Sequence, residues 1–108
     1  MKIEKENDYT VISPEGRLDT VNAPQFSEEL VALLETKPKG CVVDLSGVSF
    51  LSSSGLQALL VGAKTSKQNN IKYGVCGMNE MVKDVFVLSG FDRFIDVFDD
   101  VKGAVESL

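Results

Sequence analysis

The stretch GCVVDLSGVSFLSSSGLQALL, residues 40–60, decides how this chain folds. It begins with Cys41–Leu45, a short and nearly continuous apolar run that is typical of a β-strand covered on both faces. It ends where apolar residues start to recur at helical spacing, from Leu56 to Ala63, which predicts a helix over residues 54–68 with one buried side. Three serines and a glycine separate the two elements. The stretch therefore predicts a buried strand, a polar loop and an amphipathic helix.

The same alternation continues on both sides of this stretch. Residues 2–6 and 9–13 are β-prone and flank Asn7-Asp8, a turn signal, so they predict a hairpin. Further helices are predicted over about residues 23–36, 80–88 and 101–108, and further strands over 71–76 and 95–98. The predicted order is ββαβαβαβα. This order indicates one α/β domain over residues 1–108, with a central, mostly parallel mixed sheet and helices packed against it.

Composition excludes several classes of protein. The formal net charge is -5 and there is no polybasic stretch, so nucleic acid and anionic membranes are poor partners. No apolar run is long enough to span a bilayer, and the first residues do not form a signal peptide. We therefore expect a cytoplasmic protein without membrane insertion.

The chain contains no histidine. This removes the usual general base, the Ser-His-Asp triad and the commonest metal ligand together. Neither GxxxxGK[ST] nor GxGxxG occurs, and Cys41 and Cys76 lie in β-type runs without CxxC spacing, as expected of buried, reduced thiols. We expect a non-enzymatic protein with no catalytic residue, no metal and no cofactor.

Two aspartates leave another functional class open, that of a small ligand-binding protein or weak enzyme. Asp19 and Asp44 are expected near the carboxyl ends of strands, where open α/β sheets bind ligands. A small nucleotide-binding protein or weak hydrolase could use this edge. Alternatively, Asp19 closes a turn and Asp44 accepts backbone hydrogen bonds, as aspartates readily do.

The three serines, residues 52–54 and hereafter the serine segment, have two interpretations. Ser54 and Gln57 match a capping box, which explains Ser54 alone. Ser52 and Ser53 are then left in an exposed loop at the positive end of a helix dipole. A phosphate there would meet free backbone N–H groups and add a charge of about -1.5 to -2, which would repel a docked partner. From the residues alone, capping and a phosphorylation switch both remain open.

A wider pattern surrounds the serine segment. Glu15–Asp19 supplies G-x-L-D after the second strand, and Val42–Leu56 supplies an apolar strand followed by a serine-rich helix start. The stretch Ser89–Phe91 is similar to the end of an L-x-x-S-G-[LF] pattern. Together, over essentially the whole chain, these motifs resemble the bacterial anti-sigma factor antagonists of the STAS domain family.

The resemblance implies a partner-switching mechanism. Such antagonists bind an anti-sigma factor that is also a serine kinase, and so free a sigma factor. The kinase brings the ATP and phosphorylates the serine at the start of the second helix, which releases the antagonist until a phosphatase resets it. By position the target is Ser53, ahead of Ser52 and Ser54. Ser52 stands where the family usually has aspartate.

The expected docking face follows from the same alignment of motifs. It consists of Ser52, Ser53, Ser54, Gly55 and Leu56, flanked by Gly16, Asp19, Thr20 and Asp44. We expect a monomer or weak dimer. An alternative with the same fold is a STAS-type accessory subunit of a membrane transport or lipid-transport complex, in which the serine segment is purely structural.

Overall fold

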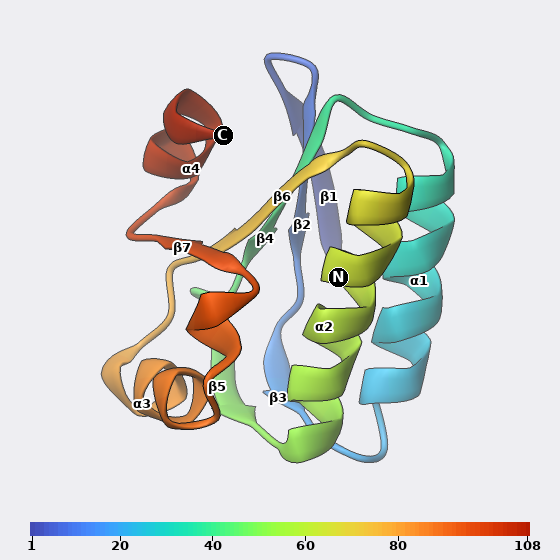
Figure 1. Ribbon diagram of the computed structural model, residues 1–108. Helices are drawn as coiled ribbons and strands as arrows, with labels where there is room; N and C mark the ends of the chain where they lie inside the picture. Colours follow the sequence, from blue (N-terminus) through green and yellow to red (C-terminus); the bar gives the residue numbers. More distant parts are fainter.

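The computed structural model describes residues 1–108 as a central sheet with helices on both of its faces (Figure 1). The sheet has five strands in the order β1-β2-β4-β6-β7. Only β1 and β2 are antiparallel, and the other neighbours are parallel. The strands are β1 (Lys2–Glu6), β2 (Tyr9–Ser13), β4 (Gly40–Asp44), β6 (Lys72–Cys76) and β7 (Asp96–Phe98). The predicted α/β class and mostly parallel mixed sheet are confirmed.

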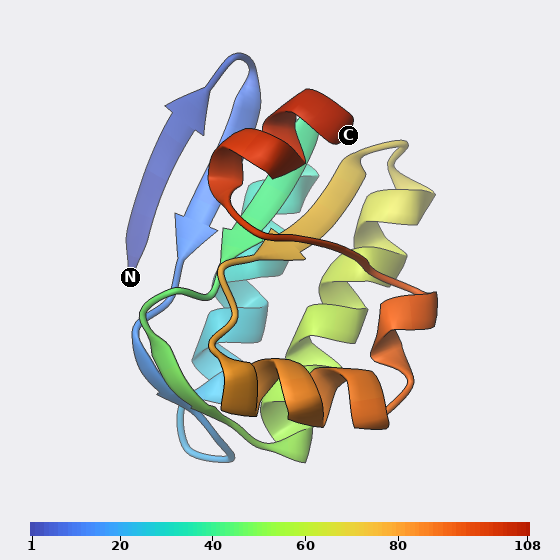
Figure 2. The same cartoon turned by 90° about the vertical axis from the view of Figure 1, so that its left-hand side faces the viewer.

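The predicted order lacks two strands. β3 (Gly16–Leu18) and β5 (Val48–Leu51) form a separate two-stranded parallel sheet, seen in Figure 2 below the ends of β2 and β4. The prediction ended the second strand near Pro14, and it treated the segment between Leu45 and the serine segment as loop. Both new strands are too short to carry a periodic pattern, and each has only the other as its partner.

Four helices surround the sheet. α1 (Ala23–Glu35) and α2 (Ser53–Gln68) lie side by side on one face, and α4 (Val101–Ser107) lies on the other (Figures 1 and 2). α3 (Glu80–Leu88) packs beside β5 and leads through a short 3₁₀ turn, η1 (Phe91–Arg93), to β7. None of the helices has both the length and the apolar character that crossing a bilayer requires.

Two hydrophobic cores hold these layers together. The larger one joins the sheet to α1, α2 and α3 and contains Ile12, Leu30, Val43, Leu59 and Phe86. The smaller one lies under α4 and contains Tyr9, Val11, Val42, Cys76 and Ala104. Because β4 contributes to both, its side chains are buried on both faces, as its continuous apolar run predicts.

The two cysteines lie in these cores. Cys41 and Cys76 are both buried and unpaired, so the prediction of buried, free thiols is confirmed. Burial raises the pKa of each thiol to about 12, and the nearby Asp44 carboxylate adds to the rise at Cys76. Both thiols are therefore protonated near neutral pH and are poor nucleophiles.

Candidate functional site: the serine segment at the start of α2

Ser52 is the N-cap of α2. Its Oγ accepts a hydrogen bond from the Gly55 N–H at 3.3 Å. Its own N–H and hydroxyl both donate to the Leu18 carbonyl, at 2.9 and 3.1 Å. The prediction that Ser54 caps the helix is therefore wrong. The chain leaves β5 extended through Ser52 (φ -88°, ψ 174°), so the helix begins two residues earlier than Ser54 would allow as its cap.

Gly55 is fixed by a close approach of two backbones. A Cβ at this position would lie 2.6 Å from the Leu18 carbonyl oxygen and 2.8 Å from Leu51 Cδ1. The Leu18 carbonyl cannot easily move, because Leu18 is paired with Leu51 in the β3–β5 sheet. Gly55 therefore lets the first turn of α2 lie directly against the end of β3.

Ser53 differs from both of its neighbours. Its side chain is exposed, and its hydroxyl has no hydrogen-bond partner within the chain, whereas Ser52 bonds Leu18 and Ser54 lies 3.4 Å from Thr20 Oγ1. The N–H groups of Ser53 and Ser54 have no acceptor either, since they are the first two of the helix. The first turn of α2 holds no acidic residue. An exposed hydroxyl thus lies beside free N–H groups at an uncompensated helix N-terminus.

The loop between β3 and α1 forms one side of the site. Thr20 reaches Ser54, and Asp19 holds the loop by accepting hydrogen bonds from the N–H groups of Val21 (3.1 Å) and Asn22 (3.3 Å). Asp19 also pairs with Arg17 at 3.5 Å. Of the two interpretations of Asp19, the structure supports the turn-forming one.

Gly16 and Asp44 lie away from the serine segment. Gly16 is at the opposite end of β3, where it pairs with Val48. Asp44 precedes β5, accepts a hydrogen bond from the Ser46 N–H at 3.0 Å and lines an open cleft with Gly77 and Asp99. Asp19 follows β3 and Asp44 ends β4, and these strands belong to different sheets, so the alternative in which the two aspartates share one sheet edge is wrong.

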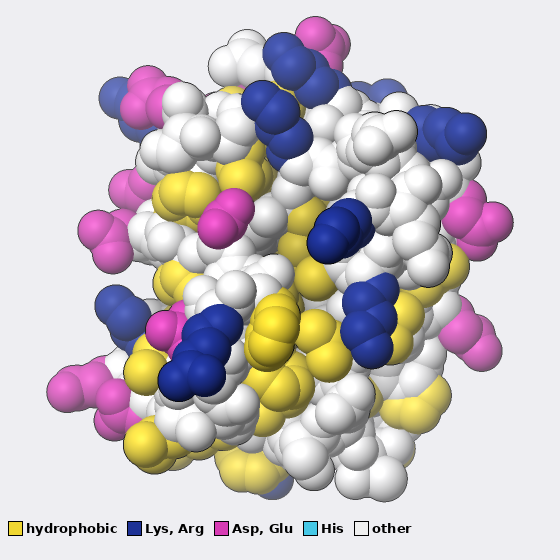
Figure 3. Space-filling view, viewed as in Figure 1, with side chains coloured by type: hydrophobic (Ala, Val, Ile, Leu, Met, Phe, Trp, Pro, Cys, Tyr) yellow, Lys and Arg dark blue, Asp and Glu magenta, His cyan; other side chains and the backbone are white.

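Sequence reasoning missed an uncharged groove beside the serine segment. The groove has a volume of about 250 Å³ and is lined by Ala23, Pro24, Ser27, Ser54, Gln57, Ala58 and Val61 of α1 and α2. Beside it, Val21 is 89% exposed. In Figure 3 the lower edge of the molecule, where α2 begins, shows mostly white and yellow atoms and few charged side chains. The available signal was Val21 itself, an apolar residue that fits no periodic pattern.

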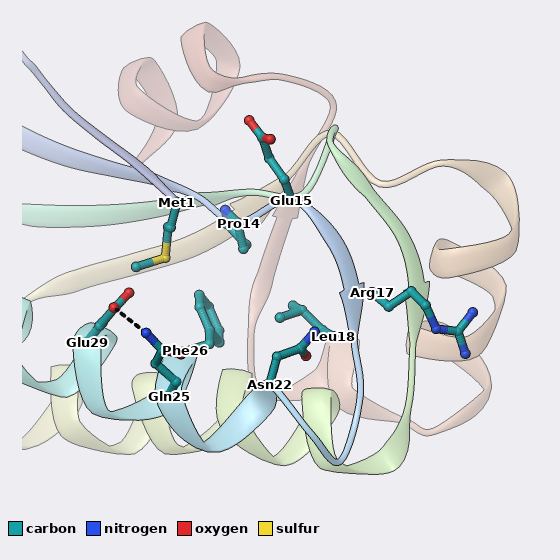
Figure 4. A pocket seen from close by; sticks show the side chains of 9 residues that line it. All are labelled: Met1, Pro14, Glu15, Arg17, Leu18, Asn22, Gln25, Phe26 and Glu29. Atoms are coloured by element: carbon teal, nitrogen blue, oxygen red, sulfur yellow. Dashed lines mark hydrogen bonds between the residues drawn. The ribbon is translucent and has the colours of Figure 1, made fainter.

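A second cleft, of about 200 Å³, lies on the other side of β3, between β3, α1 and the N-terminus (Figure 4). Phe26 and Leu18 form its floor, and Met1 closes one end. Gln25 Nε2 donates to Glu29 Oε1 at 3.4 Å along its rim. None of the three serines lines this cleft, so it is distinct from the serine site.

A model of the STAS domain family matches residues 1–104. The chain belongs to the STAS domain family. Among curated relatives, it is 27% identical over 103 residues to the anti-sigma-F factor antagonist RsfB of Mycobacterium tuberculosis, covering 95% of this chain and 84% of RsfB. The family resemblance predicted from the sequence motifs is confirmed.

Solved structures of STAS proteins agree with this assignment. An anti-sigma factor antagonist from Mycobacterium paratuberculosis superposes with a TM-score of 0.87 at 27% identity, over 98% of this chain and 90% of that one. The STAS domain of a SulP transporter from Vibrio cholerae has a TM-score of 0.75 at 20% identity, over 96% and 83%. The second likeness is one of fold alone.

Proposed function

We propose that this STAS domain is an anti-sigma factor antagonist whose binding is ended by phosphorylation of Ser53. It binds an anti-sigma factor with serine kinase activity, through the serine segment, Thr20, Val21 and the adjoining groove, and so frees a sigma factor in the cytoplasm. One observation carries the choice of residue: Ser53 alone among the three serines is exposed with an unbonded hydroxyl. The family of antagonists to which the chain is similar supports the choice of partner.

The charge of the docking face explains the switch. The groove lining contains no charged side chain, so a partner can cover it without desolvating a charge. Transfer of the γ-phosphoryl group from the kinase's ATP to Ser53 Oγ adds a charge of about -1.5 to -2 at the rim of this groove. The phosphate oxygens can accept from the free N–H groups of Ser53 and Ser54, so α2 stays folded. Binding is lost through desolvation and repulsion, and a phosphatase restores it.

Ser52 fits this proposal although it replaces the usual aspartate. Its hydroxyl donates to the Leu18 carbonyl, and an ionised aspartate has no proton to donate. Serine therefore keeps the cap and the bond to β3, and it leaves the rim uncharged until Ser53 is modified. This predicts a larger electrostatic contrast between the two states than an aspartate would allow.

The test uses candidate anti-sigma kinases from the same genome. Ser53→Ala should keep wild-type affinity and take up no phosphate by intact-mass spectrometry, whereas Ser53→Asp should bind at least about tenfold more weakly, a change of ~1.4 kcal/mol. Ser107→Asp adds the same charge at an exposed serine on α4 and should bind normally. Equal affinity of both Ser53 variants for a cognate kinase would contradict the switch.

Two alternatives make different predictions. For a transport accessory subunit, the neighbouring genes should include an ATP-binding transport component, and Ser53→Asp should not affect its assembly. For a nucleotide-binding protein, nucleotides should raise the melting temperature of the isolated chain. Asp19 and Asp44 follow strands of different sheets, which removes the shared edge on which the nucleotide hypothesis depended.

A further inference from the structure

β1 is an open edge of the main sheet. All five of its residues are exposed, and it pairs with β2 alone. In Figure 2 it lies at the outer side of the molecule with no helix or loop across it. An exposed edge strand offers unpaired backbone donors and acceptors to another strand. A partner at the β1 edge is therefore expected to be another strand that extends the sheet.

The hairpin determines which backbone groups face outward. Asn7 and Asp8 both have positive φ (52° and 69°), as in a two-residue type I′ turn, which makes Glu6 and Tyr9 a hydrogen-bonded pair. The pattern alternates along an antiparallel ladder, so Glu4 also bonds inward to β2. The N–H and C=O groups of Ile3 consequently point outward, and those of Lys5 do so too.

We propose that β1 pairs antiparallel with β1 of a second copy of this chain, about a two-fold axis at Ile3. With Ile3 opposite Ile3, Lys2 of each copy lies opposite Glu4 of the other. These are non-hydrogen-bonded positions, where side chains approach most closely. Symmetry permits only shifts that keep each residue on its own face. One such shift puts Glu4 opposite Glu4, and another puts Lys2 opposite Lys2. The Ile3 register pairs Lys2 with Glu4 and, unlike these two, places no like-charged side chains opposite each other.

The surroundings of Ile3 favour the same contact. Ile3 is 52% exposed, and it pairs with the fully buried Ile12, so it lies on the sheet face that α1 covers. α1 does not close over β1: clefts of about 200 and 450 Å³ separate them near Met1 and near Lys5. The two Ile3 side chains can therefore stack at the centre of a continuous ten-stranded sheet, with an apolar contact on the face that α1 covers and the two ion pairs on the other face.

This dimer leaves both serine segments open. β1 lies in the upper half of the molecule and the start of α2 at its lower edge in both Figure 1 and Figure 2. Two docking faces in one particle raise the apparent affinity for a dimeric partner without any new contact. The small interface predicts weak association, with a dissociation constant from about 1 μM to 1 mM.

Charge swapping tests the pairing by sedimentation velocity over a range of concentrations. Lys2→Glu and Glu4→Lys each turn both ion pairs into like-charge pairs and should weaken the dimer about tenfold or more. An equimolar mixture of the two variants should restore it, because every pair between the two copies is then again of opposite charge. The 2.9 Å pair of Lys2 and Glu4 within one chain is lost in both variants alike. Both positions are exposed, and circular dichroism checks that the variants fold.

Crosslinking tests the register. Opposed Ile3 Cα atoms lie about 5.5 Å apart in a hydrogen-bonded pair, within disulfide range, so Ile3→Cys should oxidise to a covalent dimer. Lys5→Cys is the matched control on the same face, because its two copies lie about 13 Å apart. A wild-type chain that stays monomeric at about 1 mM, variants that fail to rescue each other, or equal crosslinking at both positions would overturn the proposal.

Discussion

The starts of α2 and α3 differ in how they satisfy the free N–H groups of a helix N-terminus. Each helix is capped by a side-chain oxygen that accepts the N–H three residues on: Gly55 N–H to Ser52 Oγ at 3.3 Å, and Val82 N–H to Asn79 Oδ1 at 2.8 Å. α3 completes its first turn with an acid, Glu80, whereas α2 has two further serines and no acid. One residue is enough to cap a helix. The comparison therefore indicates that Ser53 takes no part in capping α2, which leaves its hydroxyl free for another role.

The third helical position differs as well. Val82 is 1% exposed and fills the core, while Gly55 lies against the Leu18 carbonyl. α3 is thus held by side-chain packing. α2 is held at its start by the backbone of β3, which fixes where Ser53 is presented.

The largest expected effect concerns this backbone contact. Gly55→Ala should lower the free energy of unfolding by about 1–3 kcal/mol, because the new methyl group overpacks the site, even though alanine is the better helix former by about 1 kcal/mol. Denaturant titration measures it. Ser53→Ala, two residues away and exposed, should stay within about 0.5 kcal/mol of wild type. A more stable Gly55→Ala variant would show that α2 is not pressed against β3.

The caps should give the next largest effect. Ser52→Ala and Asn79→Ala should each cost about 0.5–2 kcal/mol of unfolding free energy, since each leaves a helix N–H without its side-chain acceptor and removes a side-chain bond to a carbonyl, that of Leu18 or Val48. Ser54→Ala, which loses only a 3.4 Å contact with Thr20, is the control and should cost less. If Ser54→Ala costs more than Ser52→Ala, the assignment of the cap is wrong.

The smallest expected effect tests the absence of an acidic residue from the first turn of α2. Ser53→Asp should raise the unfolding free energy by about 0.3–1 kcal/mol through the helix dipole, and Glu80→Gln should lower it by a similar amount in α3. Both changes should shrink in high salt. A Ser53→Asp variant that is more stable yet binds its partner less would separate loss of docking from loss of folding. A destabilised variant would remove that distinction.

Much of the fold could be predicted from local patterns. The continuous apolar run of β4 and the helical spacing from Leu56 onward identified the central βα unit, and Asn7-Asp8 identified the hairpin. β3 and β5 could not be found in this way, because three and four residues carry no period and their stability comes from pairing with each other. The capping error at Ser54 has the same origin: the helix begins where β5 releases the chain, and β5 was not predicted.

The sequence by itself determined the sheet class, the family and the presence of a spare serine at a helix start, because periodicity and motif spacing are properties of neighbouring residues. Only the tertiary structure decided which serine is spare. The Ser52 hydroxyl is bonded because it donates to the carbonyl of Leu18, a residue thirty-four positions earlier in the chain. Ser54 lies beside Thr20, which belongs to the loop between β3 and α1. Ser53 is left free by contacts between segments distant in sequence, and no local pattern contains that information.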